Sequence, residues 1–341
     1  MTQKPLDLKT PYLLFLGDAQ EDGLAKTAFG IHEWCPEKCK GQMRLDGCKV
    51  DLGLEDLNPV EAKTVHNVGT LVIGVANLGG YVPDNWVAPL CGALRAGLDI
   101  AAGLHTRLND IEFLRETAKQ LGRTIYDVRQ TTQELKVGNG QKRSGKRLLT
   151  VAADCAIGKK YAALAIAKEM QSRGMAADFR ATGQTGILIA GGGIGIDAVV
   201  ADFISGAAEM VSPENAKDHW DIIEGQGALF HPAYAGVALG LLHGSQPDAL
   251  VICHDPDRSH TAFMEGFALP DMETVIRRNI EAAQLTNPHV KVAGISVNTS
   301  RMTDDDAKFY MADLSQQTKL PVCDPVRTGM NNIVDYLVHD R

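Results

Sequence analysis

The chain has 341 residues, of which 45% are apolar and 6% aromatic, and it contains 34 glycines. This length is enough for two ordinary cores, and so many glycines with so few aromatics favour an α/β architecture. The net charge of −8 leaves no basic field for nucleic acid, and no apolar run approaches the roughly 20 residues of a membrane span. We therefore expect a cytoplasmic protein that binds neither nucleic acid nor membranes. We also expect a homo-oligomer, although the sequence itself does not show the oligomeric state.

Apolar runs alternate with helical patterns along the chain, which is typical of parallel sheets covered by helices. The first series of runs comprises Tyr12–Gly17, Thr70–Ala76 and Leu98–Ala102. Residues 137–146 then lose all apolar periodicity, which indicates a linker or a loop. The second series comprises Arg147–Ala152, Ala176–Ala181, Trp220–Ile223, Ala249–Cys253 and Val290–Val297. We expect a Rossmann-like α/β domain at residues 1–140 and a P-loop-type α/β domain at residues 141–341.

The strongest local motif lies directly after the run Arg147–Ala152 and directly before the helical pattern Tyr161–Met170. In a P-loop, N–H groups of a tight turn and of the first helical turn converge on phosphate. The pattern G-x-x-x-x-G-K-[ST] is modified here, because Ala153 replaces its first glycine and Lys160 replaces the hydroxyl residue that ligates Mg²⁺. A plainer alternative is a Gly-Lys pair that only starts a helix. We expect phosphate binding, without a metal, by Asp154, Cys155, Ala156, Ile157, Gly158, Lys159 and Lys160.

Three polar segments follow strands of the second series, at the edge where open α/β sheets bind ligands. Thr182–Gly186 offers two hydroxyls, an amide and flexible backbone, although a plain turn would also explain it. Glu224–Gly227 places a carboxylate at a strand end, followed by glycines that permit close approach of a ligand. Asn298 lies in a polar strand end that often faces adenine in nucleotide-binding folds, although solvation would also explain it. We expect all three to converge on the P-loop.

The same half contains the candidate proton acceptors. His231 follows Glu224 closely enough to share its loop, and a neutral imidazole accepts protons near neutral pH. Asp197 and Asp202 lie in an apolar stretch, Ile196–Ser205, that we interpret as a helix on which the two do not share a face. Because burying either unpaired would be costly, each is a cap, an ion-pair member or a site residue. The candidate catalytic residues are Glu224, His231, Asp197 and Asp202.

The seven cysteines are odd in number and scattered, so we expect reduced thiols. Cys35, Cys39 and Cys48 form the only cluster, and a zinc site there would need a fourth ligand, for which His32 is the sole local candidate. Cys155 is adjacent to candidate site residues, and we interpret its side chain as a packing thiol rather than a nucleophile. No metal site is expected.

Five motifs, several of them described above, occur together in one order along the chain: Asp154–Lys159, Ala181–Ile187, Ala198–Ala207, Ile223–Gly227 and Leu242–Asp248. In this combination the chain closely resembles the bacterial D-glutamate N-acetyltransferase family. The resemblance extends to the first half through Gly41–Arg44, Val75–Asn77 and Gly103–His105. It implies transfer of an acetyl group from acetyl-CoA to the amine of D-glutamate, in D-glutamate degradation. More distantly, the second half resembles dethiobiotin synthetase, whose P-loop keeps a threonine for the metal of ATP.

The implied reaction needs a base, oxyanion donors and cations for the substrate carboxylates. Glu224 or His231 is the candidate base, and backbone N–H groups of Gly225–Gly227 or Gly183–Gly186 are the candidate donors. Lys159 and Lys160 would hold the phosphates of CoA without a metal. The candidate substrate-binding residues are Arg44, Arg107, Arg180, Gly183, Gln184, Thr185, Gly186, Gly225 and Gln226. The alternatives are an ATP-dependent ligase or kinase acting on a small carboxylate, and a nucleotide sensor without catalysis.

Overall fold

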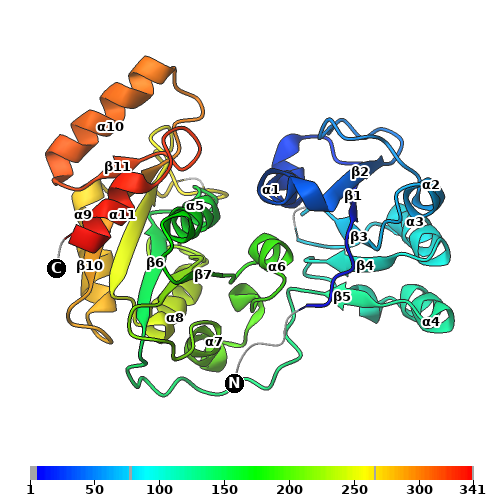
Figure 1. Ribbon diagram of the computed structural model, residues 1–341, viewed down its shortest axis with the longest axis horizontal. Helices are drawn as coiled ribbons and strands as arrows, with labels where there is room; N and C mark the ends of the chain where they lie inside the picture. The colour runs from blue at the N-terminus through cyan, green and yellow to red at the C-terminus, as the bar shows by residue number, and fades with distance from the viewer. Residues whose placement is uncertain (1–5, 77–78, 265, 340–341) are drawn as a thin grey trace. The chain divides into compact units, whose positions relative to one another are not determined.

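The computed structural model describes residues 6–76, 79–264 and 266–339, and the chain forms two compact units (Figure 1). The N-terminal unit contains Lys4–Thr132 and Gly183–Ala198, and the C-terminal unit contains Gln133–Thr182 and Val199–Arg341. Residues 133–140 and 183–198 thus lie in the unit opposite to the one that a division at residue 140 would give them. Asn77 of the first-half motif lies outside the described residues.

The N-terminal unit is a parallel sheet with the strand order β2-β1-β3-β4-β5. Its strands are β1 (Tyr12–Gly17), β2 (Cys39–Arg44), β3 (Thr70–Ile73), β4 (Asp99–Ala102) and β5 (Ile125–Asp127). On one face, α1 (Lys26–Trp34) packs against α6 (Gln184–Ala190). The other face is covered by α2 (Pro59–Thr64), α3 (Asp84–Arg95) and α4 (Glu112–Leu121). Every β1 residue is buried, as expected for a strand with helices on both faces.

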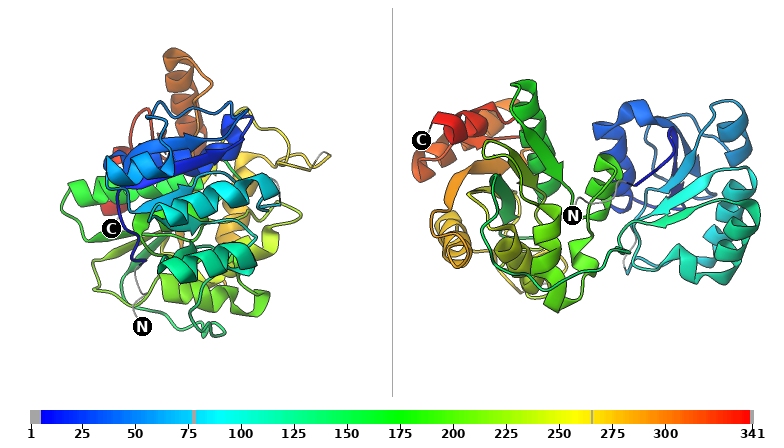
Figure 2. Two further views of the ribbon diagram at one scale, coloured as in Figure 1. Left: turned by 90° about the vertical axis from the view of Figure 1, so that its right-hand side faces the viewer. Right: turned by 60° about the horizontal axis from the view of Figure 1, so that its bottom comes forward.

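The C-terminal unit is a parallel sheet with the strand order β11-β10-β9-β6-β8-β7. Its strands are β6 (Lys146–Ala152), β7 (Ala177–Arg180), β8 (Trp220–Ile223), β9 (Ala249–His254), β10 (Lys291–Val297) and β11 (Val322–Cys323). Helices α5 (Lys159–Ser172) and α11 (Asn331–His339) contact each other on one face, with α10 (Asp304–Thr318) beside β11. Helix α8 (Ala235–Ser245) packs between α7 (Ile204–Val211) and α9 (Met272–Ala283) on the other. Figure 2 shows helices on both faces of each sheet.

The order of strands in the C-terminal unit reverses beside β6. The chain leaves β6 through α5 to β7 and returns to β8, and it then crosses to β9, β10 and β11 on the other side of β6. Ligands of open α/β sheets bind at such a switch point, outside the carboxyl ends of the strands. The loops after β6 and β9 therefore flank the expected binding crevice.

The expected fold class is confirmed, because both units are parallel sheets covered by helices. Strands form in every apolar run of both series. The helix expected over Ile196–Ser205 is wrong: Ile196–Ala198 and Ala201–Phe203 are separate 3₁₀ turns, and α7 begins only at Ile204. The extended backbone of Val200 interrupts the helix where the chain passes between the units.

Residues 137–145 contain neither helix nor strand, as the loss of periodicity predicts. The segment is nevertheless fixed to the C-terminal unit. The backbone N–H groups of Asn139 and Gly140 donate to the carboxylate of Glu209 at 3.0 Å, and the Arg143 guanidinium donates to the Ser212 carbonyl at 2.9 Å. None of the described helices is long and apolar enough to cross a membrane.

Candidate active site

The P-loop (Asp154–Lys160) has the context that its sequence predicts, because it follows β6 and leads directly into α5. Gly158 precedes the helix with φ +99°, a conformation that side-chain-bearing residues rarely adopt, although a Cβ there would meet no atom. Helix α5 has no side-chain hydrogen bond at its N-terminal cap. The start of a helix that follows such a loop favours the binding of an anion.

Lys159 lies folded over the loop, and its Nζ donates to the backbone carbonyl of Asp154 at 2.8 Å. Burial lowers the pKa of this ammonium, and neighbouring groups that include Asp154 and Glu224 oppose the effect. The Lys159 side chain passes close to Gly225, where an added Cβ would lie 2.9 Å from Lys159 Cδ and 1.8 Å from the Thr150 carbonyl oxygen. Gly225 is therefore needed for this close approach. The Lys160 side chain lies instead over the neighbouring aromatic ring, with its Nζ 5.2 Å from the ring centroid of Tyr161.

The Asp154 carboxylate is fully buried and points to the loop that follows β9. Its Oδ2 accepts from Arg258 Nη1 at 2.9 Å and from the backbone N–H of Ala262 at 2.8 Å. Its Oδ1 is buried and has no hydrogen-bond partner among the residues that the structure describes. Asp154 therefore connects the P-loop to the loop after β9. Arg258 was not predicted from the sequence, where its only signal is its place just after the run Ala249–Cys253.

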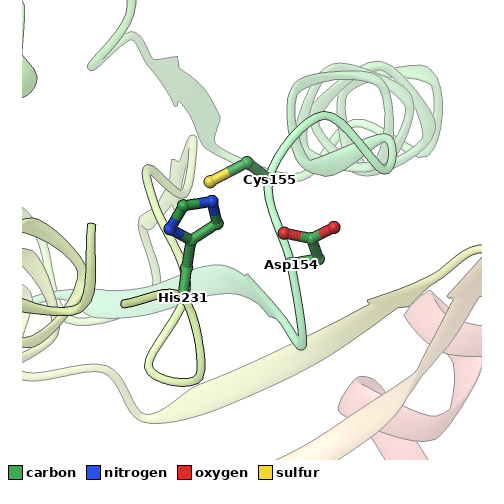
Figure 3. A group of neighbouring side chains, drawn as sticks. All are labelled: Asp154, Cys155 and His231. Atoms are coloured by element: carbon green, nitrogen blue, oxygen red, sulfur yellow. The ribbon is translucent and has the colours of Figure 1, made fainter. Parts of the chain in front are cut away.

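Asp154, Cys155 and His231 each bring one ligand atom within 4.8 Å of the others (Figure 3). The hydrogen bonds of the imidazole allow a test of metal binding. The Ala233 N–H donates to Nδ1 at 3.2 Å, so Nδ1 is unprotonated, and Nε2 lies 3.1 Å from the Ala262 carbonyl, so Nε2 carries the proton. A metal on Nε2 would displace that proton to Nδ1 and set it against the Ala233 N–H. A metal at this site would therefore have to replace the hydrogen bond between Nε2 and Ala262, and the same bonds favour His231 as an anchor of Ala262.

Glu224 directly follows β8, and its side chain is buried. Its Oε2 accepts from the backbone N–H of Thr182 at 3.0 Å, and the Thr182 hydroxyl donates to the Glu224 carbonyl at 2.5 Å. The next N–H, that of Gly225, donates to the Thr150 hydroxyl at 2.9 Å, which leaves the N–H groups of Gln226 and Gly227 as the candidate oxyanion donors of this loop. A cavity lined in part by Lys159 and Gly225 has a volume of about 10 Å³. It has room for at most one water molecule, so it is too small to hold a substrate.

Several predicted site residues belong to the N-terminal unit. Gly183–Gly186 starts α6, where the Thr185 hydroxyl lies 2.9 Å from that of Thr27. Asp197 forms an ion pair with the buried Arg129, which was not predicted from the sequence. The expected convergence of Gly183–Gly186 with the P-loop stays a prediction.

The two remaining polar candidates have local roles in the C-terminal unit. Asp202 lies exposed in a 3₁₀ turn. The carboxamide of Asn298 accepts from the backbone N–H of Ser300 at 3.2 Å, which closes a turn after β10. This contact of Asn298 does not involve the P-loop.

The three candidate arginines already have acidic partners. Arg44 pairs with Asp51 and Asp56, and Arg107 lies 4.0 Å from Asp110. Arg180 pairs with the buried Asp221 at 2.7 Å. Of the three arginines, Arg107 has the longest ion pair and the most exposed side chain, at 48%. A substrate carboxylate would therefore displace an existing partner most easily at Arg107.

The fold and the loop define the class: a two-unit α/β protein whose C-terminal unit carries a modified P-loop. Residues 136–334 match the family model described as a P-loop domain of unknown function, the C-terminal domain of DUF1611. Residues 43–131 match the Rossmann-like N-terminal domain of the same family. The chain therefore belongs to the DUF1611 family.

Relatives with names and a solved structure agree with this assignment. A D-glutamate N-acetyltransferase of Tritonibacter scottomollicae is 46% identical over 330 residues, covering 97% of this chain and 99% of its own. A D-glutamate N-acetyltransferase of a Pseudoalteromonas species is 46% identical over 96% of this chain and 99% of its own. The crystal structure of a DUF1611 protein from Anabaena variabilis superposes with a TM-score of 0.87 at 31% identity, covering 97% of this chain and 100% of that one. The resemblance drawn from the sequence motifs is confirmed.

Proposed function

We propose that this protein is a D-glutamate N-acetyltransferase, which transfers an acetyl group from acetyl-CoA to the amine of D-glutamate and forms N-acetyl-D-glutamate. The observation that carries the proposal is the 46% identity to two D-glutamate N-acetyltransferases over nearly the whole of each chain. Its place in D-glutamate degradation, its cytoplasmic location and its assembly as a homo-oligomer stay predictions.

The P-loop supports a role in holding acetyl-CoA. Coenzyme A carries a pyrophosphate and a 3′-phosphate, and the uncapped start of α5 offers N–H donors to such groups. Lys159 supplies a cation within the loop. Lys160 stands where an ATP-using P-loop keeps the hydroxyl that ligates Mg²⁺, which favours metal-free phosphate binding over ATP chemistry.

Glu224 is the better supported base for the attacking amine. The ammonium of D-glutamate must lose a proton before nitrogen attacks the thioester carbon. The Glu224 carboxylate can accept that proton, whereas His231 holds its proton on Nε2 and receives a hydrogen bond on Nδ1. Negative charge then develops on the thioester oxygen, and the N–H groups of Gln226 and Gly227 are candidate donors to it. The thiolate of CoA leaves with the electron pair, and it takes up the second proton, which the nitrogen loses as it becomes an amide.

The test is a coupled pair of assays on the purified protein. Acetyl-CoA with D-glutamate should release free thiol, and ATP with D-glutamate should release no phosphate. A panel of D- and L-amino acids in the thiol assay defines the acceptor. Phosphate release without thiol release would replace this proposal with a ligase or kinase of the dethiobiotin-synthetase type.

We expect activity to persist after exhaustive treatment with a metal chelator. Lys160 replaces the P-loop hydroxyl, and the hydrogen bonds of His231 oppose metal binding beside Asp154 and Cys155. The measurement is the rate of thiol release before and after chelation and dialysis. Loss of activity that Mg²⁺ or Zn²⁺ restores would contradict the expectation.

Cys155→Ala should keep kcat within a few-fold of the native value. Burial raises the pKa of the Cys155 thiol, and the adjacent imidazole carries its proton on Nε2, so thiolate formation is disfavoured. Acetyl transfer is then direct, and intact mass spectrometry after incubation with acetyl-CoA alone should find no acetylated protein. An acetyl-enzyme that disappears in Cys155→Ala would instead establish a covalent intermediate.

A further inference from the structure

An acidic residue inside a phosphate-binding loop presents an electrostatic problem. A carboxylate close to bound phosphate weakens binding by like-charge repulsion. Asp154 is fully buried, and its Oδ1 has no hydrogen-bond partner among the described residues, which further costs stability. The role of Asp154 must therefore lie in the residues that its carboxylate holds in place.

Those contacts bring a cation from a distant part of the chain to the loop. Arg258 Nη1 donates to Asp154 Oδ2 at 2.9 Å and to the Cys155 carbonyl at 3.0 Å. The topology makes this reach possible, because Arg258 follows β9, and β9 pairs directly with β6, which precedes the P-loop. Both residues thus lie at the switch point of the sheet, where ligands bind.

Contacts within the protein hold the loop after β9, and Arg258 with it. The Arg258 backbone N–H donates to the Asp255 carbonyl at 3.1 Å, and the buried Asp255 carboxylate accepts from Arg301 at 2.9 Å. A few residues further on, Ala262 is anchored by Asp154 and by His231. The loop that carries Arg258 is therefore held on both sides of this residue. Restricting the guanidinium in this way lowers the entropy cost of binding an anion.

The rest of the guanidinium remains able to donate. Arg258 uses Nη1 for both of its loop contacts, and within the described ranges Nε and Nη2 have no hydrogen-bond partner. The side chain is 25% exposed, so this edge reaches solvent. A planar guanidinium with a free edge matches two oxygens of one phosphate.

We propose that Arg258, held at the P-loop by Asp154, is a phosphate-binding residue for acetyl-CoA. The inference rests on the proposed function for the identity of the ligand. With Lys159 and Arg258 against Asp154, the loop keeps a positive balance, and the carboxylate serves the site by fixing the second cation.

The first experiment measures the dissociation constants of CoA, dephospho-CoA and inorganic pyrophosphate by calorimetry. Arg258→Ala should weaken CoA binding about 10-fold or more, the usual worth of a charged hydrogen bond. Arg277→Ala, which removes an exposed arginine from α9, should leave it unchanged. Equal weakening of CoA and dephospho-CoA assigns Arg258 to the pyrophosphate, and weakening of CoA alone assigns it to the 3′-phosphate.

The second experiment uses the sign of an effect at Asp154. If Asp154 only repelled phosphate, Asp154→Asn would strengthen CoA binding, whereas a residue that positions Arg258 predicts weakening. In the Arg258→Ala background the same substitution should no longer weaken binding. Thermal unfolding of each variant monitors folding.

Native affinity of Arg258→Ala for both CoA and pyrophosphate would overturn the proposal. The fate of the proposed function is read separately. Native protein that releases no thiol with D-glutamate, yet binds pyrophosphate in an Arg258-dependent manner, would refute the acetyltransferase and leave the phosphate site standing.

Discussion

Lys159→Ala is expected to raise the KM for acetyl-CoA about 10- to 100-fold, the range for losing a charged hydrogen bond to phosphate. The KM for D-glutamate should change little. The reason is the place of Lys159 in the loop, where its ammonium lies at the start of an uncapped helix. Steady-state kinetics with each substrate varied in turn separates the two constants.

A matched control comes from the same helix. Lys168 is exposed on α5, so Lys168→Ala removes one positive charge without touching the loop. The pH dependence adds a second readout. Because burial lowers the pKa of Lys159, its ammonium is lost at lower pH than that of an exposed lysine, and affinity for acetyl-CoA should fall as the pH rises through that value. An unchanged acetyl-CoA KM in Lys159→Ala would refute the phosphate-binding role of the loop.

The fold was predictable from the sequence where strands are continuous apolar runs. The runs that became β1, β6 and β9 are such segments, since both faces of these strands are covered. The missed strands are shorter or less regular: β2 alternates polar and apolar residues at a sheet edge, β5 has three residues and β11 has only two. The pattern of apolar residues also cannot show that the chain crosses to the other unit after Thr182 and returns after Ala198. For this reason the pattern of Ile196–Ser205 predicts one helix where the structure has two 3₁₀ turns and the start of α7.

The site was predictable only where its residues adjoin a strand. The P-loop and Glu224 follow β6 and β8 directly, so their place at the carboxyl edge follows from the strand pattern. Arg258 was missed because its contact with Asp154 spans 104 residues and depends on the pairing of β9 with β6. Sequence spacing also did not predict that the charges of Arg44 and Arg180 are paired with carboxylates, and the role of both residues in substrate binding stays a prediction.

Glu224→Gln is expected to lower kcat by about 10²-fold or more, the usual worth of general base catalysis, with the acetyl-CoA dissociation constant nearly unchanged. The substitution is close to isosteric, and the carboxamide oxygen can still accept from the Thr182 N–H. The pH profile of kcat/KM should lose its acidic limb. Glu209→Gln is the control, because Glu209 also accepts backbone N–H groups in the C-terminal unit but lies outside the candidate site.

His231→Asn distinguishes the two candidate bases. Since the imidazole anchors Ala262 and holds its proton on Nε2, this variant should disturb the loop after β9 and raise the acetyl-CoA KM while the acidic limb persists. Loss of the acidic limb in His231→Asn with retention in Glu224→Gln would exchange the assignments. If both variants kept native kcat, the base would lie elsewhere. His254, the last residue of β9, would then be examined first, because its Nε2 lies 2.7 Å from the Tyr310 hydroxyl. Asp197 and Asp202 would follow.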